Sequence, residues 1–218
     1  MNKLPDLENC TIAILGLGYV GLPLAIEFAK CKKSVANKEY LNRKVIGFDI
    51  SENRINELRQ GIDITREVSS ENILKLDNIK FSNDYSLLTS ASIFIVTVPT
   101  PIDSSRSPDL TIIKKACHTI GKILKQRDQY LSTKKSSFIP VVIFESTVYP
   151  GATEEVCIPI IEKESGLSIY SGAEVEKCFA YGYSPERINP GDKDHRISSI
   201  TKVTSGNIKE VANWIDAL

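Results

Sequence analysis

Three glycines near the start of the chain have the spacing of a phosphate-binding turn. In the stretch GLGYVG, Gly16, Gly18 and Gly21 form the pattern GxGxxG. The first glycine of such a turn allows a tight bend, the second lets the backbone approach a diphosphate, and the third lets a helix pack closely. The run TIAILG before the pattern predicts a strand, and YVGLPLAIEFAKC after it predicts a helix. This context predicts a dinucleotide site that includes Tyr19 and Val20; the alternative is a glycine turn that binds no nucleotide.

A carboxylate and an arginine follow the next predicted strand. The run KVIGFDIS places Asp49 at the strand end, where a carboxylate holds the ribose hydroxyls of an adenosine. Its distance from the glycines exceeds the usual ~20 residues, and the insert KKSVANKEYLNR accounts for the excess. Because a carboxylate repels a 2′-phosphate, we predict NAD rather than NADP; Asp49 as a helix cap is the alternative. Arg54 is predicted to reach the adenosine-phosphate side of the cofactor, with a solvated surface charge as its alternative.

Prolines and polar residues end three further predicted strands. These strands, 91–98, 139–144 and 177–182, end in VPTPID, ESTVYPG and YSPERINPGD. Ligands of open parallel sheets bind beyond the carboxyl ends of the strands. We therefore predict that Pro99, Thr100 and Thr147 contact the ribose, the nicotinamide amide or a substrate. A purely structural role in a turn is the alternative for each threonine.

Alternating strands and helices must position these residues. Apolar runs typical of buried parallel strands are followed by amphipathic helical patterns. The predicted strands are 11–16, 44–51, 79–84, 91–99, 139–146, 178–183 and 197–206, and the predicted helices are 19–31, 51–61, 71–77, 109–127, 151–164 and 207–218. This order predicts an α/β protein with a doubly wound, Rossmann-like parallel sheet covered by helices on both faces.

The composition indicates a folded protein without net charge. The 218 residues are 42% hydrophobic, and 27 basic side chains balance 27 acidic ones. Neither nucleic acid nor a membrane is therefore predicted as a partner. The apolar run 11–26 is shorter than the ~20 residues that span a bilayer, and the N-terminus lacks a signal-peptide pattern. We expect a cytoplasmic protein.

The cysteines and histidines indicate neither disulfides nor a metal centre. The five cysteines form no CxxC pair, and His118 and His195 have no ligand spacing, so no metal is predicted. Cys117, Cys157 and Cys178 lie in apolar patterns and are expected in the core.

Five motifs together resemble those of the UDP-glucose/GDP-mannose dehydrogenase family. They are GLGYVGLPLA, GFDIS, VPTPID, ESTVYPG and YSPERINPGD, and the resemblance extends over nearly all of residues 11–206. The form SPERINPGDK is most similar to the branch that acts on UDP-N-acetylhexosamines for surface polysaccharides. UDP-glucose enzymes carry a second glutamate four residues after the first, where this chain has Pro190, and this departure fits the same branch.

The resemblance implies an enzyme that oxidises a sugar C6 alcohol to a carboxylate with two NAD. The matched positions imply that NAD is held by the Val20 backbone, Asp49, Arg54, Thr100 and Thr147.

At the third strand end, the resemblance implies catalytic and substrate-binding residues. Glu186 matches the family glutamate proposed as the base for the hydrolytic water. Its alternative is an internal ion pair with Arg187 or another basic group. Arg187, Ile188 and Asn189 are implied to line the nucleotide-sugar site.

The family's nucleophilic cysteine has no counterpart in this chain. In the family it stands in a glycine-rich motif of a later domain, and none of the five cysteines has that context. We therefore expect residues 1–206 to form the NAD-binding domain and residues 207–218 to begin a helix that links it to a missing part. The isolated chain is expected to be inactive, and the full-length enzyme is expected to be a homodimer.

Two other functions stay open at this point. One is a two-electron dehydrogenase of the hydroxyacid type, which shares the glycine turn but lacks the sequence SPERINPG. The other is a non-catalytic nucleotide-binding or scaffold domain, which the absent nucleophile favours.

Overall fold

The computed structural model describes residues 3–34, 37–131, 138–173, 177–187 and 201–218. The strands are β1 (Thr11–Leu15), β2 (Lys44–Phe48), β3 (Ile79–Ser82), β4 (Ile93–Val96), β5 (Val141–Phe144), β6 (Ser168–Ile169), β7 (Cys178–Tyr183) and β8 (Ser205–Gly206). The helices are α1 (Gly21–Lys30), α2 (Glu52–Arg59), α3 (Ser70–Leu74), α4 (Thr111–Leu131), α5 (Ile158–Ser165) and α6 (Lys209–Ala217).

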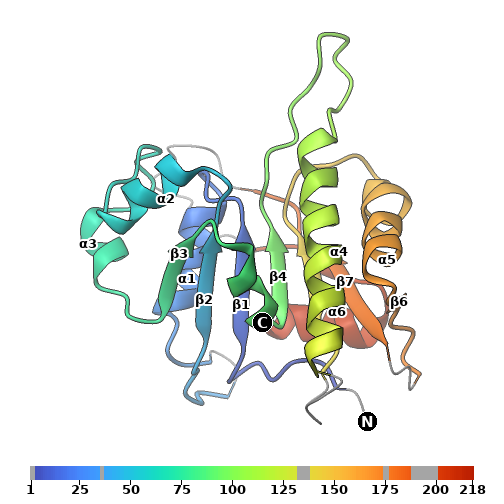
Figure 1. The fold of residues 1–218 in the computed structure, drawn as a ribbon. Coiled ribbons are helices and arrows are strands. Elements are labelled where there is room, and N and C mark those ends of the chain that lie inside the picture. Colours follow the sequence, from blue (N-terminus) through green and yellow to red (C-terminus); the bar gives the residue numbers. More distant parts are fainter. Residues whose placement is uncertain (1–2, 35–36, 132–137, 174–176, 188–200) are drawn as a thin grey trace.

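The strands form one sheet in the order β3-β2-β1-β4-β5-β7-β6, with β8 paired to β7. All neighbours on this path are parallel, and only β8 runs antiparallel. The direction of strand addition reverses between β1 and β4, which is the switch point where doubly wound sheets bind ligands. The predicted fold is confirmed (Figure 1).

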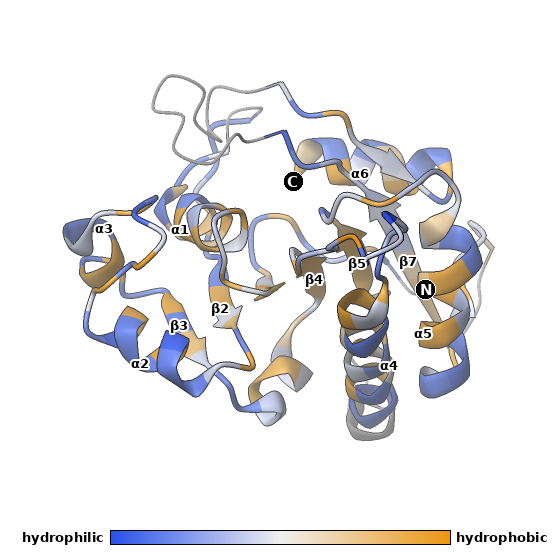
Figure 2. Ribbon diagram, turned by 90° about the horizontal axis from the view of Figure 1, so that it is seen from above, coloured by the Kyte–Doolittle hydropathy of each residue, from blue (hydrophilic) through white to orange (hydrophobic). Residues whose placement is uncertain are grey.

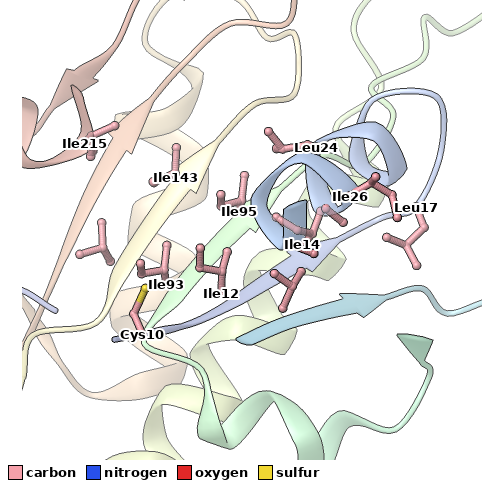
Figure 3. Close-up of a cluster of buried hydrophobic side chains, with 14 of the residues drawn as sticks. Cys10, Ile12, Ile14, Leu17, Leu24, Ile26, Ile93, Ile95, Ile143 and Ile215 are labelled. Atoms are coloured by element: carbon pink, nitrogen blue, oxygen red, sulfur yellow. The ribbon is translucent and has the colours of Figure 1, made fainter. Parts of the chain in front are cut away.

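Helices cover both faces of the sheet and create two apolar cores. Side chains of α1 and α6 pack on one face with Ile12, Ile14, Ile93 and Ile95 (Figure 3). Side chains of α4 and α5 pack on the other face, around Phe94 and neighbouring strand residues. Viewed from above, the apolar strands lie between these helix layers (Figure 2). Burial on both faces explains the continuous apolar runs of the central strands.

The helix boundaries follow local chemistry. The Ser51 hydroxyl accepts a hydrogen bond from the Arg54 amide and caps α2. Gly61, with φ of 76°, and Gly166, with φ of 72°, adopt the left-handed conformation just after α2 and α5.

The helix predicted over 151–164 has an irregular first part. Residues Thr153–Cys157 form a π-helical segment before α5. Pro159 lacks an N–H and therefore cannot close the α-helical hydrogen bond to Glu155. The wider turn that precedes it is consistent with this missing donor.

The prediction of a strand over 197–206 is wrong for most of the described residues of this segment, 201–206. Residues 197–200 lie outside the described residues, and only Ser205–Gly206 form a strand. Residues 201–204 alternate between exposed and half-buried instead of being buried on both faces. The short segments β6 and Tyr85–Ser90, a 3₁₀ helix, have too few residues for a sequence pattern and were not predicted.

The central strand β1 gives a direct test of the core. Ile14 is fully buried, whereas Ile64 is 64% exposed. Ile14→Ala should lower the free energy of unfolding by about 2–5 kcal/mol because it leaves a cavity beneath α1. The matched change Ile64→Ala should stay within about 0.5 kcal/mol. Urea unfolding of both variants measures the difference, and equal effects would contradict the packing described here.

Candidate functional site

A cavity of about 830 Å³ lies beyond the carboxyl ends of β1, β2, β4 and β5. Most of the predicted site residues line it, although they come from five separate segments of the chain. They are Gly16, Gly18, Tyr19, Val20, Asp49, Pro99, Thr100, Thr147 and Glu186. The cavity therefore lies at the switch point of the sheet, as the strand-end motifs predicted.

The first and third glycines allow helix α1 to lie against the turn. Gly16 has φ of 97°, which favours glycine. A Cβ on Gly21 would lie 1.9 Å from the Gly16 carbonyl oxygen and 2.4 Å from Thr97 Oγ1. Thr97 Oγ1 in turn donates to the carbonyls of Leu15 and Gly16, at 3.0 and 2.7 Å. Gly21 thus lies behind the cavity and supports it by close packing.

The second glycine faces open space at the start of α1. A Cβ on Gly18 would have no heavy atom within 4 Å. Helix α1 has no side-chain cap and no acidic residue in its first turn, whereas α2 has both. The backbone N–H groups of a glycine turn and the positive end of the helix dipole that follows it form an anion site. The geometry fits the diphosphate of a dinucleotide.

Asp49 joins the glycine turn to the end of β2. Its Oδ2 accepts from the Leu17 amide at 2.8 Å, and its Oδ1 accepts from the Ser51 amide at 2.9 Å. The alternative of a simple helix cap is wrong, because Ser51 caps α2. Asp49 is half-buried and lines the cavity, so its carboxylate is held in place beside the turn.

Arg54 lies behind the turn and outside the cavity lining. It is 7% exposed, so the alternative of a solvated surface charge is wrong. Its Nε donates to the Leu17 carbonyl at 2.9 Å, and its Nη2 donates to Asp63 Oδ1 at 2.8 Å. Arg54 therefore supports the backbone of the turn, and a direct contact with the cofactor stays a prediction.

Hydroxyl groups tie together the loops after β4 and β5. Thr100 Oγ1 donates to the Thr147 carbonyl, and Ser146 Oγ donates to the Val98 carbonyl at 2.6 Å. Pro99 and Pro101 restrict the first of these loops, and both line the cavity with Thr100 and Thr147. The two predicted threonines are thus brought together at one wall of the cavity.

Two acidic residues reach the cavity from β5 and β7. Glu186 follows β7 and lines the cavity as predicted, and Glu145 follows β5 and lines it as well. Glu145 is 6% exposed and forms an ion pair with Lys202. Burial raises the pKa of Glu145, and nearby Glu186 raises it further, although Lys202 opposes the shift. Glu145 is the first residue of the motif ESTVYPG, but nothing in the sequence indicated that it would line the cavity rather than simply end the strand.

The substrate-binding predictions are only partly described. Arg187 is exposed, does not line the cavity, and donates from Nη1 to the Thr201 carbonyl at 3.5 Å. Ile188 and Asn189 lie outside the described residues.

An apolar wall of the cavity was not predicted. It is formed by Phe48, Ile50 and Tyr85 together with Ile112 and Ala116 of α4. The Phe48 and Tyr85 ring centroids lie 4.9 Å apart. These side chains provide a surface suited to an adenine ring.

Four of the five cysteines are buried packing residues. Cys117, Cys157 and Cys178 are buried, as predicted, and none of the five lines the cavity formed by the described residues. Within the described ranges there is no cluster of three His, Cys, Asp or Glu residues that could bind a metal. No helix in those ranges is long and apolar enough to span a membrane.

The family comparison agrees with this site. The model of the UDP-glucose/GDP-mannose dehydrogenase family, NAD binding domain, matches residues 10–216. The chain is 49% identical over 212 residues to UDP-N-acetyl-D-glucosamine 6-dehydrogenase of Pseudomonas aeruginosa, covering 97% of this chain and 43% of that protein. The protein of the same name from Salmonella typhi is 41% identical over 210 residues, with coverages of 96% and 43%.

A solved structure shares the fold. NDP-N-acetyl-D-galactosaminuronic acid dehydrogenase of Methanosarcina mazei superposes with a TM-score of 0.75 at 25% identity, over 100% of this chain and 44% of that one. The chain therefore spans less than half the length of these relatives.

The geometry of the glycine turn predicts that the same change, glycine to alanine, affects stability at one position and NAD binding at another. Gly21→Ala should destabilise the fold by about 1–3 kcal/mol or more, because its Cβ would collide with the Gly16 carbonyl. Gly18→Ala should keep stability within about 0.5 kcal/mol. It should nevertheless weaken NAD binding by about tenfold, or 1.4 kcal/mol, because its Cβ enters the cavity. Urea unfolding and calorimetry with NAD measure the two effects; a stable Gly21→Ala would contradict the close contact.

Asp63 predicts a pH dependence of stability. Burial alone would raise the pKa of Asp63, but hydrogen bonds from Thr65, Arg54 and Val68 hold it below its usual value. Because the folded-state pKa is the lower one, the stabilisation is present above the unfolded-state pKa. It is lost as the pH falls through the folded-state value.

Asp63→Asn should remove this part of the acid dependence. It should also cost about 3–5 kcal/mol at neutral pH, because it removes the carboxylate 2.8 Å from the buried Arg54 guanidinium and leaves only Glu57, at 4.0 Å, as its counter-ion among the described residues. Asp77→Asn is the control, since the Asp77 side chain is 95% exposed. Unfolding titrations between about pH 2 and 7 test this, and an unchanged acid slope in Asp63→Asn would refute it.

Proposed function

The chain belongs to the UDP-glucose/GDP-mannose dehydrogenase family and matches the family's NAD-binding domain, and from this premise we propose which enzyme it is part of. We propose that the chain is the NAD-binding domain of a nucleotide-sugar 6-dehydrogenase. This enzyme would oxidise the C6 alcohol of a UDP-N-acetylhexosamine to the uronate, for surface polysaccharide synthesis. The observation that carries this proposal is that Glu186 lines the same cavity as the glycine turn. The names of the relatives and the sequence SPERINPGDK support the choice of sugar.

The cavity suggests how NAD would be held. The N-terminus of α1 and Gly18 would bind the diphosphate, and Asp49 would accept hydrogen bonds from the adenosine ribose. Phe48 and Tyr85 would pack on the adenine, while the loops bearing Thr100 and Thr147 would hold the nicotinamide half. When bound, NAD accepts hydride from the substrate.

Glu186 would act as the base of the hydrolytic step. Glu186 follows β7 and lines the cavity, and Arg187, Ile188 and Asn189 come directly after it in the sequence. We propose that these three residues contribute to the sugar-nucleotide site. Since none of the five cysteines lines the cavity, the nucleophile for the second oxidation would come from outside these 218 residues.

The chain spans less than half the length of its relatives, which supports the following proposed organisation. Residues 1–206 would form the NAD-binding domain, and residues 207–218, which include α6, would begin the helix that continues into the rest of the enzyme. The complete protein would be a cytoplasmic homodimer, and the isolated chain would bind NAD without completing the reaction.

Two alternatives make different predictions. A scaffold domain would bind a nucleotide without any turnover in the complete protein. A hydroxyacid dehydrogenase would release one NADH per substrate and would ignore UDP-sugars. Family membership and the acidic end of the cavity favour the nucleotide-sugar enzyme.

The stoichiometry of turnover tests the proposal. The complete protein should produce two NADH for each UDP-N-acetylhexosamine, and it should prefer this substrate to UDP-glucose. Glu186→Gln should slow turnover by about 10²–10⁴-fold, the usual contribution of a general base, without loss of NAD binding. NADH absorbance and product analysis measure both; one NADH per sugar, or full activity of Glu186→Gln, would contradict the proposal.

A further inference from the structure

A buried ion pair lies behind the glycine turn, outside the lining of the cavity. Arg54 Nη2 donates to Asp63 Oδ1 at 2.8 Å, and the two side chains are 8% and 1% exposed. The Nε of the same guanidinium donates to the Leu17 carbonyl at 2.9 Å. Arg54 therefore connects Asp63, which lies between α2 and α3, to the backbone of the turn. Neither Arg54 nor Asp63 lines the cavity.

Asp63 is the centre of a short hydrogen-bonded loop. Its Oδ1 accepts from the Thr65 amide at 3.1 Å and from the Thr65 hydroxyl at 2.7 Å. Its Oδ2 accepts from the amides of Glu67 and Val68 at 2.9 and 3.0 Å. Val68 also packs against the apolar core. These contacts fix the carboxylate in one place, so the anchor point of the Arg54 guanidinium is fixed as well.

Glu57 is a competing partner for the same guanidinium. Its Oε2 lies 4.0 Å from Arg54 Nη1, one turn along α2. Both of these atoms are buried and have no hydrogen-bond partner among the described residues. Without Asp63, Glu57 is near enough to attract the guanidinium. A guanidinium that turned toward Glu57 would lose its alignment with the Leu17 carbonyl, because its N–H groups lie in one rigid plane.

The Leu17 peptide is part of the candidate anion site. Its amide donates to Asp49 Oδ2 at 2.8 Å, and its carbonyl accepts from Arg54. Leu17 lies between Gly16 and Gly18, and all three residues line the cavity. Backbone N–H groups bind an anion best when they already point at it, because a turn that must first be ordered loses affinity.

We propose that Asp63 is a positioning residue for the dinucleotide, and that through Arg54 it holds the Leu17 peptide in the orientation that binds the diphosphate. This inference rests on the proposed place of NAD at the glycine turn. It goes further because it gives a role in cofactor affinity to a residue that does not line the cavity.

The charge of Asp63 gives this role a distinctive sign. NAD carries a negatively charged diphosphate. A carboxylate that acted only through its charge would repel the cofactor, so its removal would strengthen binding. The removal of a positioning residue weakens binding instead.

Calorimetry of the 218-residue chain with NAD measures this sign. Asp63→Asn should weaken NAD binding by about tenfold, a typical coupling within one hydrogen-bond network. Ile161→Ala is the control for a general loss of stability, because Ile161 of α5 is fully buried in the core formed with α4. It should keep the affinity within about twofold. Unchanged or tighter binding of NAD by Asp63→Asn would overturn the inference.

A double-mutant cycle tests whether Asp63 acts through Arg54. In Arg54→Met there is no guanidinium to position, so the further change Asp63→Asn should alter NAD affinity by less than about twofold. The NMR signal of the Arg54 Nε–H group adds a readout that a general loss of stability does not move. It should shift in Asp63→Asn and stay in place in Ile161→Ala. Equal effects of Asp63→Asn in both backgrounds, or an unmoved signal, would refute the inference.

Should Asp63→Asn not fold, Asp63→Glu decides. This variant keeps a buried counter-ion for Arg54 but lengthens the side chain by a methylene group, which displaces the carboxylate. It should shift the Arg54 Nε–H signal and weaken NAD binding. An Asp63→Glu variant with the signal and the affinity of the unaltered chain would contradict the inference.

Gly18→Ala separates this inference from the proposed cofactor site. If Gly18→Ala binds NAD as tightly as the unaltered chain, the proposed place of the diphosphate is wrong, and the inference falls with it. If Gly18→Ala weakens binding but Asp63→Asn does not, the proposed site stands and the role of Asp63 is refuted.

Discussion

The contact between Gly21 and the Gly16 carbonyl is the constraint on which the site depends. No side chain fits between them, so α1 begins directly against the turn after β1. This approach points the N-terminus of the helix at the cavity and brings Leu17 within reach of Asp49 and Arg54. The turn is therefore held from both sides, by a carboxylate on its amide and a guanidinium on its carbonyl.

The sequence predicted the features that local chemistry determines. The spacing of the glycines predicted the turn, and continuous apolar runs predicted the central strands. Each of these patterns involves only residues that are close in sequence, so it can be recognised without the fold. Asp49 was found because its strand end has a fixed place in the fold, even though an insert lengthened the preceding loop. The same reasoning located Thr100, Thr147 and Glu186 at one cavity, since parallel strands end at the same edge.

Contacts between distant segments were not predictable in the same way. Lys202 lies in a run that predicted a strand, and its ion pair with Glu145, which follows β5, forms only when that segment packs against the sheet. Thr97 lies in a predicted strand, but its hydroxyl donates to the carbonyls of Leu15 and Gly16 beneath α1. Arg54 was predicted to lie near the glycine turn, and it does. No sequence pattern indicated that its side chain would lie behind the backbone of the turn. Such roles depend on three-dimensional packing and leave no periodic signal in the sequence.

The division of charge across the cavity connects these features to the chemistry. In the proposed function one end offers the N-terminus of α1 to a diphosphate and Asp49 to a ribose, and the other end carries Glu186 and the ion pair of Glu145 with Lys202. The most direct test of this account is calorimetry of the chain with NAD and with NADP. We predict that NAD binds at least about tenfold more tightly, a difference of 1.4 kcal/mol, and that Asp49→Ala abolishes this preference. Equal affinity of the unaltered chain for both cofactors, or no binding of NAD, would contradict it.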